Sequence, residues 1–112
     1  MKILLIEDGI SGKSIEIIFG HLYDIKRVYL LNDGLKELES SSYDVVLLDM
    51  YLPDSFCPEK NLEQVLSKID KSKIICLSGD SQLENLVNSK NVEWLGKPFS
   101  FNELKIKIEK RR

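Results

Sequence analysis

Apolar residues follow two spacings along the chain, and the two spacings alternate. Short runs of consecutive apolar residues, such as 45–48, predict strands that are buried on both faces. Apolar residues that repeat at i, i+3, i+4 and i+7 predict helices with a single apolar stripe. The first such stripe consists of Ile15, Ile18, Phe19 and Leu22. Polar residues and glycine between such segments predict turns, and residues 32–34 (Asn-Asp-Gly) are a turn and a possible helix start.

Five strands and five helices are expected from this alternation. The predicted strands are residues 2–6, 25–31, 45–49, 74–77 and 91–95. The predicted helices are residues 11–22, 35–38, 62–69 and 83–87, and a last helix that follows Ser100. Ser100 and Glu103 form a capping-box signature, and the residues expected to face inward from that helix are Phe101, Leu104 and Ile108. The pattern predicts an α/β fold, in which helices cover both faces of a doubly wound parallel sheet.

Polar side chains follow four of the predicted strands at the point where each strand ends. Glu7 and Asp8 follow the first strand, Asp49 ends the third, Ser78 follows the fourth and Lys97 follows the fifth. Because the carboxyl ends of parallel strands meet at one edge of a sheet, these groups are expected to converge. Three carboxylates in one place need a cation or raised pKa values, and a small set of oxygen ligands suits Mg²⁺. With a hydroxyl and an ammonium added, these are the groups that phosphoryl transfer needs.

Composition narrows the class of protein. The 112 residues are expected to form a single domain, 1–112, and 43% hydrophobic residues are typical of a globular protein. A net charge of −2 gives no broad attraction to nucleic acid or anionic lipid, and no apolar run is long enough to cross a membrane. Cys57 and Cys76 lie far apart and are expected to be reduced, which favours a cytoplasmic location.

These motifs make the sequence similar to the receiver (phosphoacceptor) domain of two-component response regulators, which has the CheY-like fold. The similarity extends over essentially the whole chain. Its strongest blocks are residues 3–8, 44–53 (Asp-Val-Val-Leu-Leu-Asp-Met-Tyr-Leu-Pro), 77–79 and 97–100, together with Glu103 and Leu104. The resemblance implies a (βα)5 flavodoxin/CheY-like sheet with the strand order 2-1-3-4-5.

The resemblance also implies a role for each of the acidic residues. Asp49 looks like the residue that is phosphorylated by a histidine kinase or a histidine phosphotransfer protein. By the same resemblance, Asp8 and Asp49 would bind Mg²⁺ directly, together with the backbone carbonyl of Tyr51. Glu7 would act on the metal through a bound water.

Three further positions match the family pattern on the opposite side of the predicted site. By resemblance, Lys97 would pair with the phosphoryl oxygens, and its peptide bond to Pro98 is cis in the family. Ser78 matches the Ser/Thr that hydrogen-bonds the phosphoryl group. Trp94 matches the switching aromatic position, which is usually Tyr or Phe.

The chain departs from the family pattern in several places. The loop after Pro53 normally reaches a glycine within about four residues, but residues 54–60 intervene here. Either Asn61 takes the left-handed conformation of that glycine, or Pro58 starts the helix early. The Gly-Ala that usually precedes the fifth strand is replaced by residues 90–91 (Lys-Asn), and the last helix carries an off-stripe Ile106.

The expected function is a signalling switch that catalyses only its own phosphorylation and dephosphorylation. Phosphorylation is expected to change binding through the face formed by residues 81–108. The partner there would be an output domain, a downstream protein or a second copy of the chain. No direct nucleic-acid or membrane partner is expected. Two alternatives are a pseudo-receiver that binds proteins without phosphorylation and a small Mg²⁺-dependent phosphatase.

Overall fold

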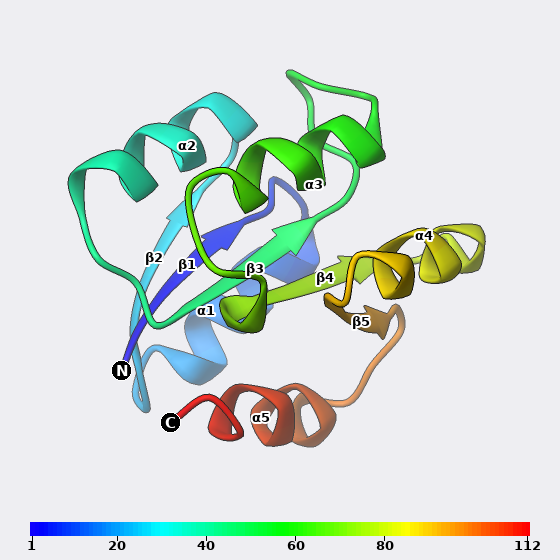
Figure 1. The fold of residues 1–112 in the computed structure, drawn as a ribbon. Helices are drawn as coiled ribbons and strands as arrows, with labels where there is room; N and C mark the ends of the chain where they lie inside the picture. Colours follow the sequence, from blue (N-terminus) through cyan, green and yellow to red (C-terminus); the bar gives the residue numbers. More distant parts are fainter.

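A five-stranded parallel sheet forms the centre of the computed structural model, which describes residues 1–112 (Figure 1). The strands are β1 (Lys2–Ile6), β2 (Asp24–Val28), β3 (Val45–Asp49), β4 (Ile74–Ser78) and β5 (Glu93–Gly96). Their order across the sheet is β2-β1-β3-β4-β5, and every neighbouring pair is parallel. The predicted fold class and strand order are therefore confirmed. The order reverses direction between β1 and β3, which is where open α/β sheets bind ligands.

Five α-helices and two short 3-10 segments connect the strands. The helices are α1 (Ile10–Phe19), α2 (Leu31–Ser40), α3 (Pro58–Leu66), α4 (Glu84–Ser89) and α5 (Phe101–Glu109), and the 3-10 segments are η1 (Lys71–Lys73) and η2 (Ser81–Leu83). Helices α1 and α5 cover one face of the sheet, while α2, α3 and α4 lie on the other (Figure 1). None of the helices has both the length and the apolar composition needed to cross a membrane.

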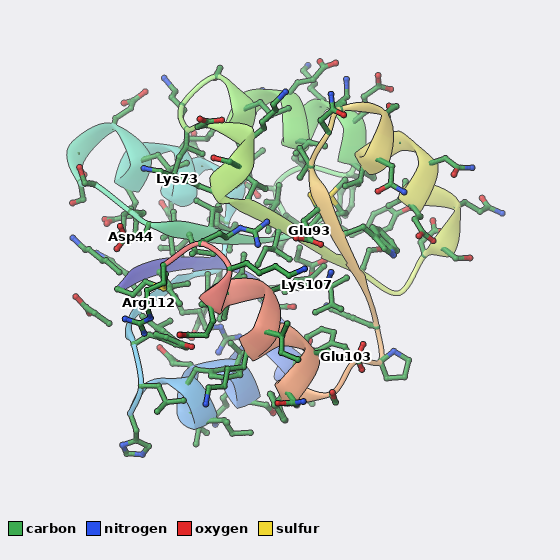
Figure 2. The ribbon with its side chains drawn as sticks, turned by 60° about the horizontal axis from the view of Figure 1, so that its bottom comes forward. Asp44, Lys73, Glu93, Glu103, Lys107 and Arg112 are labelled. Atoms are coloured by element: carbon green, nitrogen blue, oxygen red, sulfur yellow. The ribbon has the colours of Figure 1, made fainter.

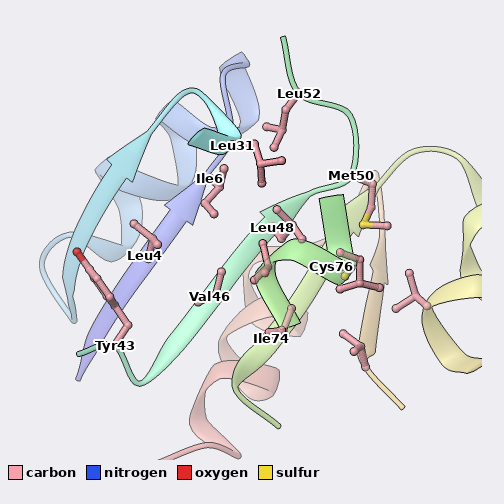
Figure 3. Close-up of a cluster of buried hydrophobic side chains, with 14 residues drawn as sticks. Leu4, Ile6, Leu31, Tyr43, Val46, Leu48, Met50, Leu52, Ile74 and Cys76 are labelled. Atoms are coloured by element: carbon pink, nitrogen blue, oxygen red, sulfur yellow. The ribbon is translucent and has the colours of Figure 1, made fainter. Parts of the chain in front are cut away.

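The central strands read as continuous apolar runs because both of their faces are buried. Alternate residues point to opposite faces of the sheet. The strand residues beneath α2 and α3 are Leu4, Ile6, Val46, Leu48, Ile74 and Cys76 (Figure 3). Those beneath α1 and α5 are Ile3, Leu5, Val45, Leu47, Ile75 and Leu77. All twelve are fully buried, and burying each large side chain contributes roughly 1.5–3 kcal/mol.

The edge strand β2 and the start of α2 differ from their predictions. The strand ends at Val28, short of the predicted residue 31, because α2 already begins at Leu31. Of the two interpretations of residues 32–34, a turn or a helix start, the helix start is correct, since these residues lie in the first helical turn. Asp33 lies in that turn, where a negative charge complements the helix dipole. Gly34 faces the Ile6 side chain, and a Cβ at that position would lie 2.5 Å from Ile6 Cδ1.

The predicted stripe on α1 is only half right. Ile15 and Phe19 are buried, but Ile18 is 44% exposed and Leu22 is 53% exposed. Leu22 lies outside the helix, which ends at Phe19, so the periodic spacing does not place it on the buried face.

The capping box that was predicted at the start of the last helix is present. The Ser100 hydroxyl accepts a hydrogen bond from the Glu103 backbone N–H, and the Glu103 carboxylate accepts one from the Ser100 N–H. Leu104 and Ile108 are buried as expected. Phe101 is 37% exposed and packs edge-on against a ring of α1, so its predicted inward position is only partly right.

Pro58 and Asn91 explain how the chain accommodates the long loop after Pro53 and the missing Gly-Ala before β5. Helix α3 begins at Pro58, so the early start is the correct alternative, and Asn61 lies inside the helix. The one non-glycine residue with a positive φ, 58°, is Asn91, between α4 and β5. Asparagine tolerates this left-handed conformation better than most residues, which explains how the chain turns there without a glycine.

Asn61 fastens the long β3–α3 loop to the core. Its side chain is fully buried, and its amide donates hydrogen bonds to the carbonyls of Met50 (3.1 Å) and Ser55 (3.0 Å). The Ser55 hydroxyl donates to the Asn61 side-chain oxygen. One side chain thus binds two backbone carbonyls of this loop.

Replacing Asn61 with alanine should destabilise the protein by about 2–3 kcal/mol, because the loop carbonyls lose their buried donors. Urea unfolding measures the change. Asn85→Ala, at an exposed position in α4, is the matched control and should change the free energy of unfolding little. Equal stabilities of the two variants would contradict the role of Asn61.

Glu93 joins β5 to α5 through two ion pairs. Its carboxylate lies 2.6 Å from Lys107 Nζ and 3.2 Å from Arg111 Nη2, and Figure 2 shows Glu93 facing Lys107. Burial raises the pKa of Glu93, but the hydrogen bonds from these two cations outweigh burial and hold its pKa below the ordinary value of 4.5.

The stabilisation from Glu93 should therefore be fully present above pH 4.5 and be lost as the pH falls through the lower pKa of the folded state. Glu93→Gln should lower the free energy of unfolding by about 1 kcal/mol or less at pH 7, because the pair is partly exposed. Denaturant unfolding from pH 7 to pH 3 should show a smaller loss for the variant than for the wild type. Parallel curves for the two proteins would exclude this contribution.

Candidate functional site

The acidic residues that follow β1 and β3 meet at the carboxyl edge of the sheet. Register pairs Ile6 with Leu48, so the residues that follow them, Glu7 and Asp49, leave adjacent strands at the same level. One carboxylate oxygen from each of Glu7, Asp8 and Asp49 lies within 4.8 Å of the others. Glu7 is 2% exposed and Asp49 is 8% exposed, whereas Asp8 faces solvent.

Lys97 reaches the same place from the loop after β5. Its ammonium lies 2.8 Å from Glu7 Oε2 and 3.6 Å from Asp49 Oδ2. The Lys97 backbone N–H donates to the Ser78 carbonyl at 2.8 Å, and the Lys97–Pro98 peptide bond is cis. The structure thus brings the predicted lysine between the two buried acids.

The ammonium of Lys97 compensates one buried acid more fully than the other. Burial raises the pKa of Glu7, but the hydrogen bonds and charge of Lys97 outweigh burial, so the net pKa of Glu7 lies below its ordinary value. Burial and then the negative charge of Glu7 raise the pKa of Asp49 to about 7. Lys97 lies nearer to Glu7 than to Asp49, so the charge of Asp49 is compensated less.

This donor set suits a small, hard cation. Its ligand atoms are carboxylate oxygens, with no sulfur or imidazole nitrogen among them. Mg²⁺ prefers such oxygen ligands and retains several waters, which the exposed Asp8 leaves room for. A cation here would also lower the pKa of Asp49 by opposing the charge of Glu7.

Glu7 is held by protein donors in addition to Lys97. The Gly9 backbone N–H donates to Glu7 Oε1 at 3.1 Å, and the Ser11 hydroxyl donates to Oε2 at 3.2 Å. Both donors belong to the first residues of the β1–α1 connection and α1. Glu7 is thus a fixed acceptor at the base of the site, while Asp8 is the acid open to solvent.

Ser78 and Tyr51 lie at the rim of the site and share one neighbour. The buried Ser78 hydroxyl accepts a hydrogen bond from the Asp80 backbone N–H at 3.0 Å. The Tyr51 hydroxyl donates to the Asp80 carboxylate at 2.8 Å, and the Tyr51 backbone N–H donates to Asp49 Oδ1 at 3.2 Å. The sequence indicates residues 78–80 as a possible helix N-cap, and Asp80 does cap η2, but nothing in the sequence indicates its hydrogen bond with Tyr51.

Trp94 lies apart from the acids. It is partly buried on β5, pairs in register with Cys76, and packs against the hydrophobic cluster beneath α3 and α4. Its indole Nε1 would lie 3.4 Å from a Cβ at Gly96. This is an ordinary contact distance, so the indole ring packs alongside Gly96 without requiring a glycine there. The role of Trp94 in switching stays a prediction.

Sequence comparison finds relatives among regulatory proteins. The transcriptional regulatory protein CiaR of Streptococcus pneumoniae is 31% identical over an alignment of 117 positions. The alignment covers 97% of this chain and 50% of CiaR. The cell cycle response regulator CtrA of Brucella ovis is 32% identical over 113 residues, which cover 96% of this chain and 48% of CtrA. The chain therefore spans about half the length of the curated relatives it matches. No protein-family model matches it.

Structural comparison agrees with the sequence relatives. The response regulator protein TrrA of Thermotoga maritima, solved in complex with Mg(2+)-BeF, superposes with a TM-score of 0.82 at 28% sequence identity. The match covers 99% of this chain and 98% of the TrrA chain. Here the similarity extends across the whole of both chains.

The crowding of acids predicts that Asp49 destabilises the protein when no divalent cation is present. Its pKa is about 7 in the folded state and near 3.8 when unfolded, so the contribution of Asp49 to stability is most favourable below pH 3.8 and is lost as the pH rises through 7. Asp49→Asn should raise the free energy of unfolding by about 2 kcal/mol at pH 8. Denaturant unfolding in a chelating buffer measures this. The exposed-residue control Asp24→Asn should have little effect, and an Asp49→Asn protein no more stable than the wild type would contradict the assignment.

Proposed function

We propose that this chain, which is a CheY-like receiver domain of the response-regulator family, accepts a phosphoryl group on Asp49. The donor would be a phosphorylated histidine of a kinase or of a phosphotransfer protein. One observation carries the proposal: a buried carboxylate lies at the switch point of the sheet, with an ammonium and two further acids around it. The relatives and TrrA support the same class of activity.

The proposed transfer is a substitution at phosphorus. A carboxylate oxygen of Asp49 forms the new P–O bond while the P–N bond to the donor imidazole breaks. The bonding pair passes to the imidazole nitrogen, which takes up a proton. Asp49 must be ionised to attack, and because its pKa is raised to about 7 in the cation-free protein, added positive charge would increase the fraction that is ionised.

Neighbouring side chains can stabilise the charge on the transferred group. Lys97 lies within 3.6 Å of Asp49 and can share its ammonium between Glu7 and the phosphoryl oxygens. The Ser78 hydroxyl accepts one hydrogen bond from the Asp80 N–H, so its own hydrogen is free to be donated. Mg²⁺, held by Asp8 and Asp49 with the Tyr51 carbonyl and by Glu7 through water, would supply further positive charge.

The output is a shift between two arrangements of the domain. A phosphoryl group adds a charge of about −1.5 to −2, and the arrangement that compensates this charge better becomes more populated. We propose that the face formed by residues 81–108, with Trp94, differs between the two arrangements. The partner on that face would be an output domain, a downstream protein or a second copy. The cytoplasmic location stays a prediction of the sequence.

Incubation with Mg²⁺ and a small phosphodonor such as acetyl phosphate should add one phosphate to the wild type. Asp49→Asn should show no adduct by mass spectrometry, because the nucleophile is gone. Asp33→Asn, which changes an exposed acid of α2, should still be modified.

An unchanged adduct on Asp49→Asn would refute the assignment. A wild type that binds no Mg²⁺ and takes up no phosphate would indicate the pseudo-receiver instead. Many turnovers of an external phosphate ester would indicate the phosphatase alternative.

A further inference from the structure

Arg27 contacts the acidic loop from the edge of the sheet. It lies on β2, and its guanidinium donates one hydrogen bond to the Glu7 carbonyl at 3.0 Å and another to the Gly9 carbonyl at 2.7 Å. Arg27 forms no ion pair with any carboxylate. A charged side chain is thus committed to two backbone carbonyls, one on each side of Asp8.

The geometry of these two bonds requires arginine. The guanidinium is planar and presents its donors as a rigid fork. Two carbonyls that accept from this fork are therefore held at a fixed distance and orientation from one another. A lysine ammonium could keep the charge but could not span both carbonyls in the same way. Because the carbonyls belong to Glu7 and Gly9, the fork defines the backbone shape from which the Asp8 side chain projects.

Packing fixes the Arg27 side chain at two contacts. The Tyr29 ring lies 4.7 Å from the guanidinium carbon, at cation–π distance. Helix α1 approaches the same side chain at Gly12, where a Cβ would lie 3.0 Å from Arg27 Nε and 2.2 Å from Glu7 Cγ. Any larger residue at Gly12 would displace the side chains of both Glu7 and Arg27. The acidic loop, the first turns of α1 and Arg27 therefore form one packed unit.

We propose that Arg27 is a positioning residue for the cation site: it holds the Glu7–Gly9 backbone so that Glu7 and Asp8 face Asp49 before a cation binds. The inference rests on the proposed function, since it assumes that these acids bind Mg²⁺. Acids that repel one another would otherwise separate, and the binding of a cation would then have to restore their arrangement. Residues that orient metal ligands commonly change metal affinity about 10- to 100-fold when they are replaced.

Two opposite effects of Arg27 can be separated by mutation. Its positive charge alone would weaken the binding of a cation by repulsion. Its fork of hydrogen-bond donors would strengthen the binding by ordering the loop. Arg27→Lys keeps the charge and removes the fork, while Arg27→Gln removes both. Lys26→Gln removes a charge from the neighbouring position of the same strand, where the side chain pairs with Glu37 and does not touch the loop.

Mg²⁺ titration by calorimetry on each full-length chain, with urea unfolding alongside, tests the proposal. Arg27→Lys and Arg27→Gln should each weaken Mg²⁺ binding about tenfold or more, and Lys26→Gln should bind like the wild type. Arg27→Lys retains the aliphatic part of the side chain and its charge. If Arg27→Gln does not fold, the Mg²⁺ affinity of Arg27→Lys decides the test.

Three results would overturn the proposal. If Arg27→Lys binds Mg²⁺ like the wild type, the fork does not position the acids. If Arg27→Gln binds more tightly than the wild type, the charge of Arg27 is its main effect. If both variants lose stability but not affinity, the residue is only structural. A wild type that binds no Mg²⁺ would overturn the proposed function as well, which distinguishes that failure from the other three.

Discussion

Two buried carboxylates, those of Glu7 and Asp49, share the single ammonium of Lys97. The properties of the site follow from this excess of negative charge over positive charge. Removing a carboxylate from water is costly unless charge and hydrogen bonds replace the lost hydration. Glu7 obtains both from Lys97, Gly9 and Ser11, and its pKa lies below its ordinary value. Asp49 receives less, and its pKa is raised to about 7. The parallel sheet maintains this difference between the two acids, because register places the ends of β1 and β3 side by side.

The connections at this edge of the sheet are held by side chains from other segments. Asp54, in the unusually long loop after β3, accepts hydrogen bonds from the backbone N–H groups of Leu31 (2.8 Å) and Asn32 (3.0 Å) and so caps α2 from outside that helix. Asn61 fixes the same loop to the core from the opposite end. Because the additional residues lie between these two anchors, the loop can be longer than in the family pattern without moving Asp49.

Sequence reasoning succeeded where burial on both faces leaves a continuous apolar run, because such a run has few alternatives to a central strand. It also placed the acids and the lysine together, because the carboxyl ends of parallel strands lie at one edge of the sheet whatever the conformation of the loops. It failed where the decisive partner is distant in sequence. Nothing near Arg27 indicates that it binds the carbonyls of Glu7 and Gly9, and Ile18 has the spacing of a core residue yet is 44% exposed. Sequence reasoning also left open whether Asn61 takes a left-handed conformation. The left-handed asparagine instead lies at position 91, where the chain leaves α4.

The hydrogen bonds of Asp80 connect the acid site physically to the start of the 81–108 face. The Asp80 N–H holds the Ser78 hydroxyl, one carboxylate oxygen caps η2 through the Gln82 N–H at 3.0 Å, and the other accepts from Tyr51. A phosphoryl group that drew Ser78 toward Asp49 would break the first of these bonds while leaving the Asp80 carboxylate in its cap. The freed N–H would then need a new acceptor, and the local change that supplies one would fall at Asp80, the residue that caps η2. Coupling between the acid site and the 81–108 face therefore requires only that the contacts of Asp80 have two alternative arrangements. The sheet itself need not move.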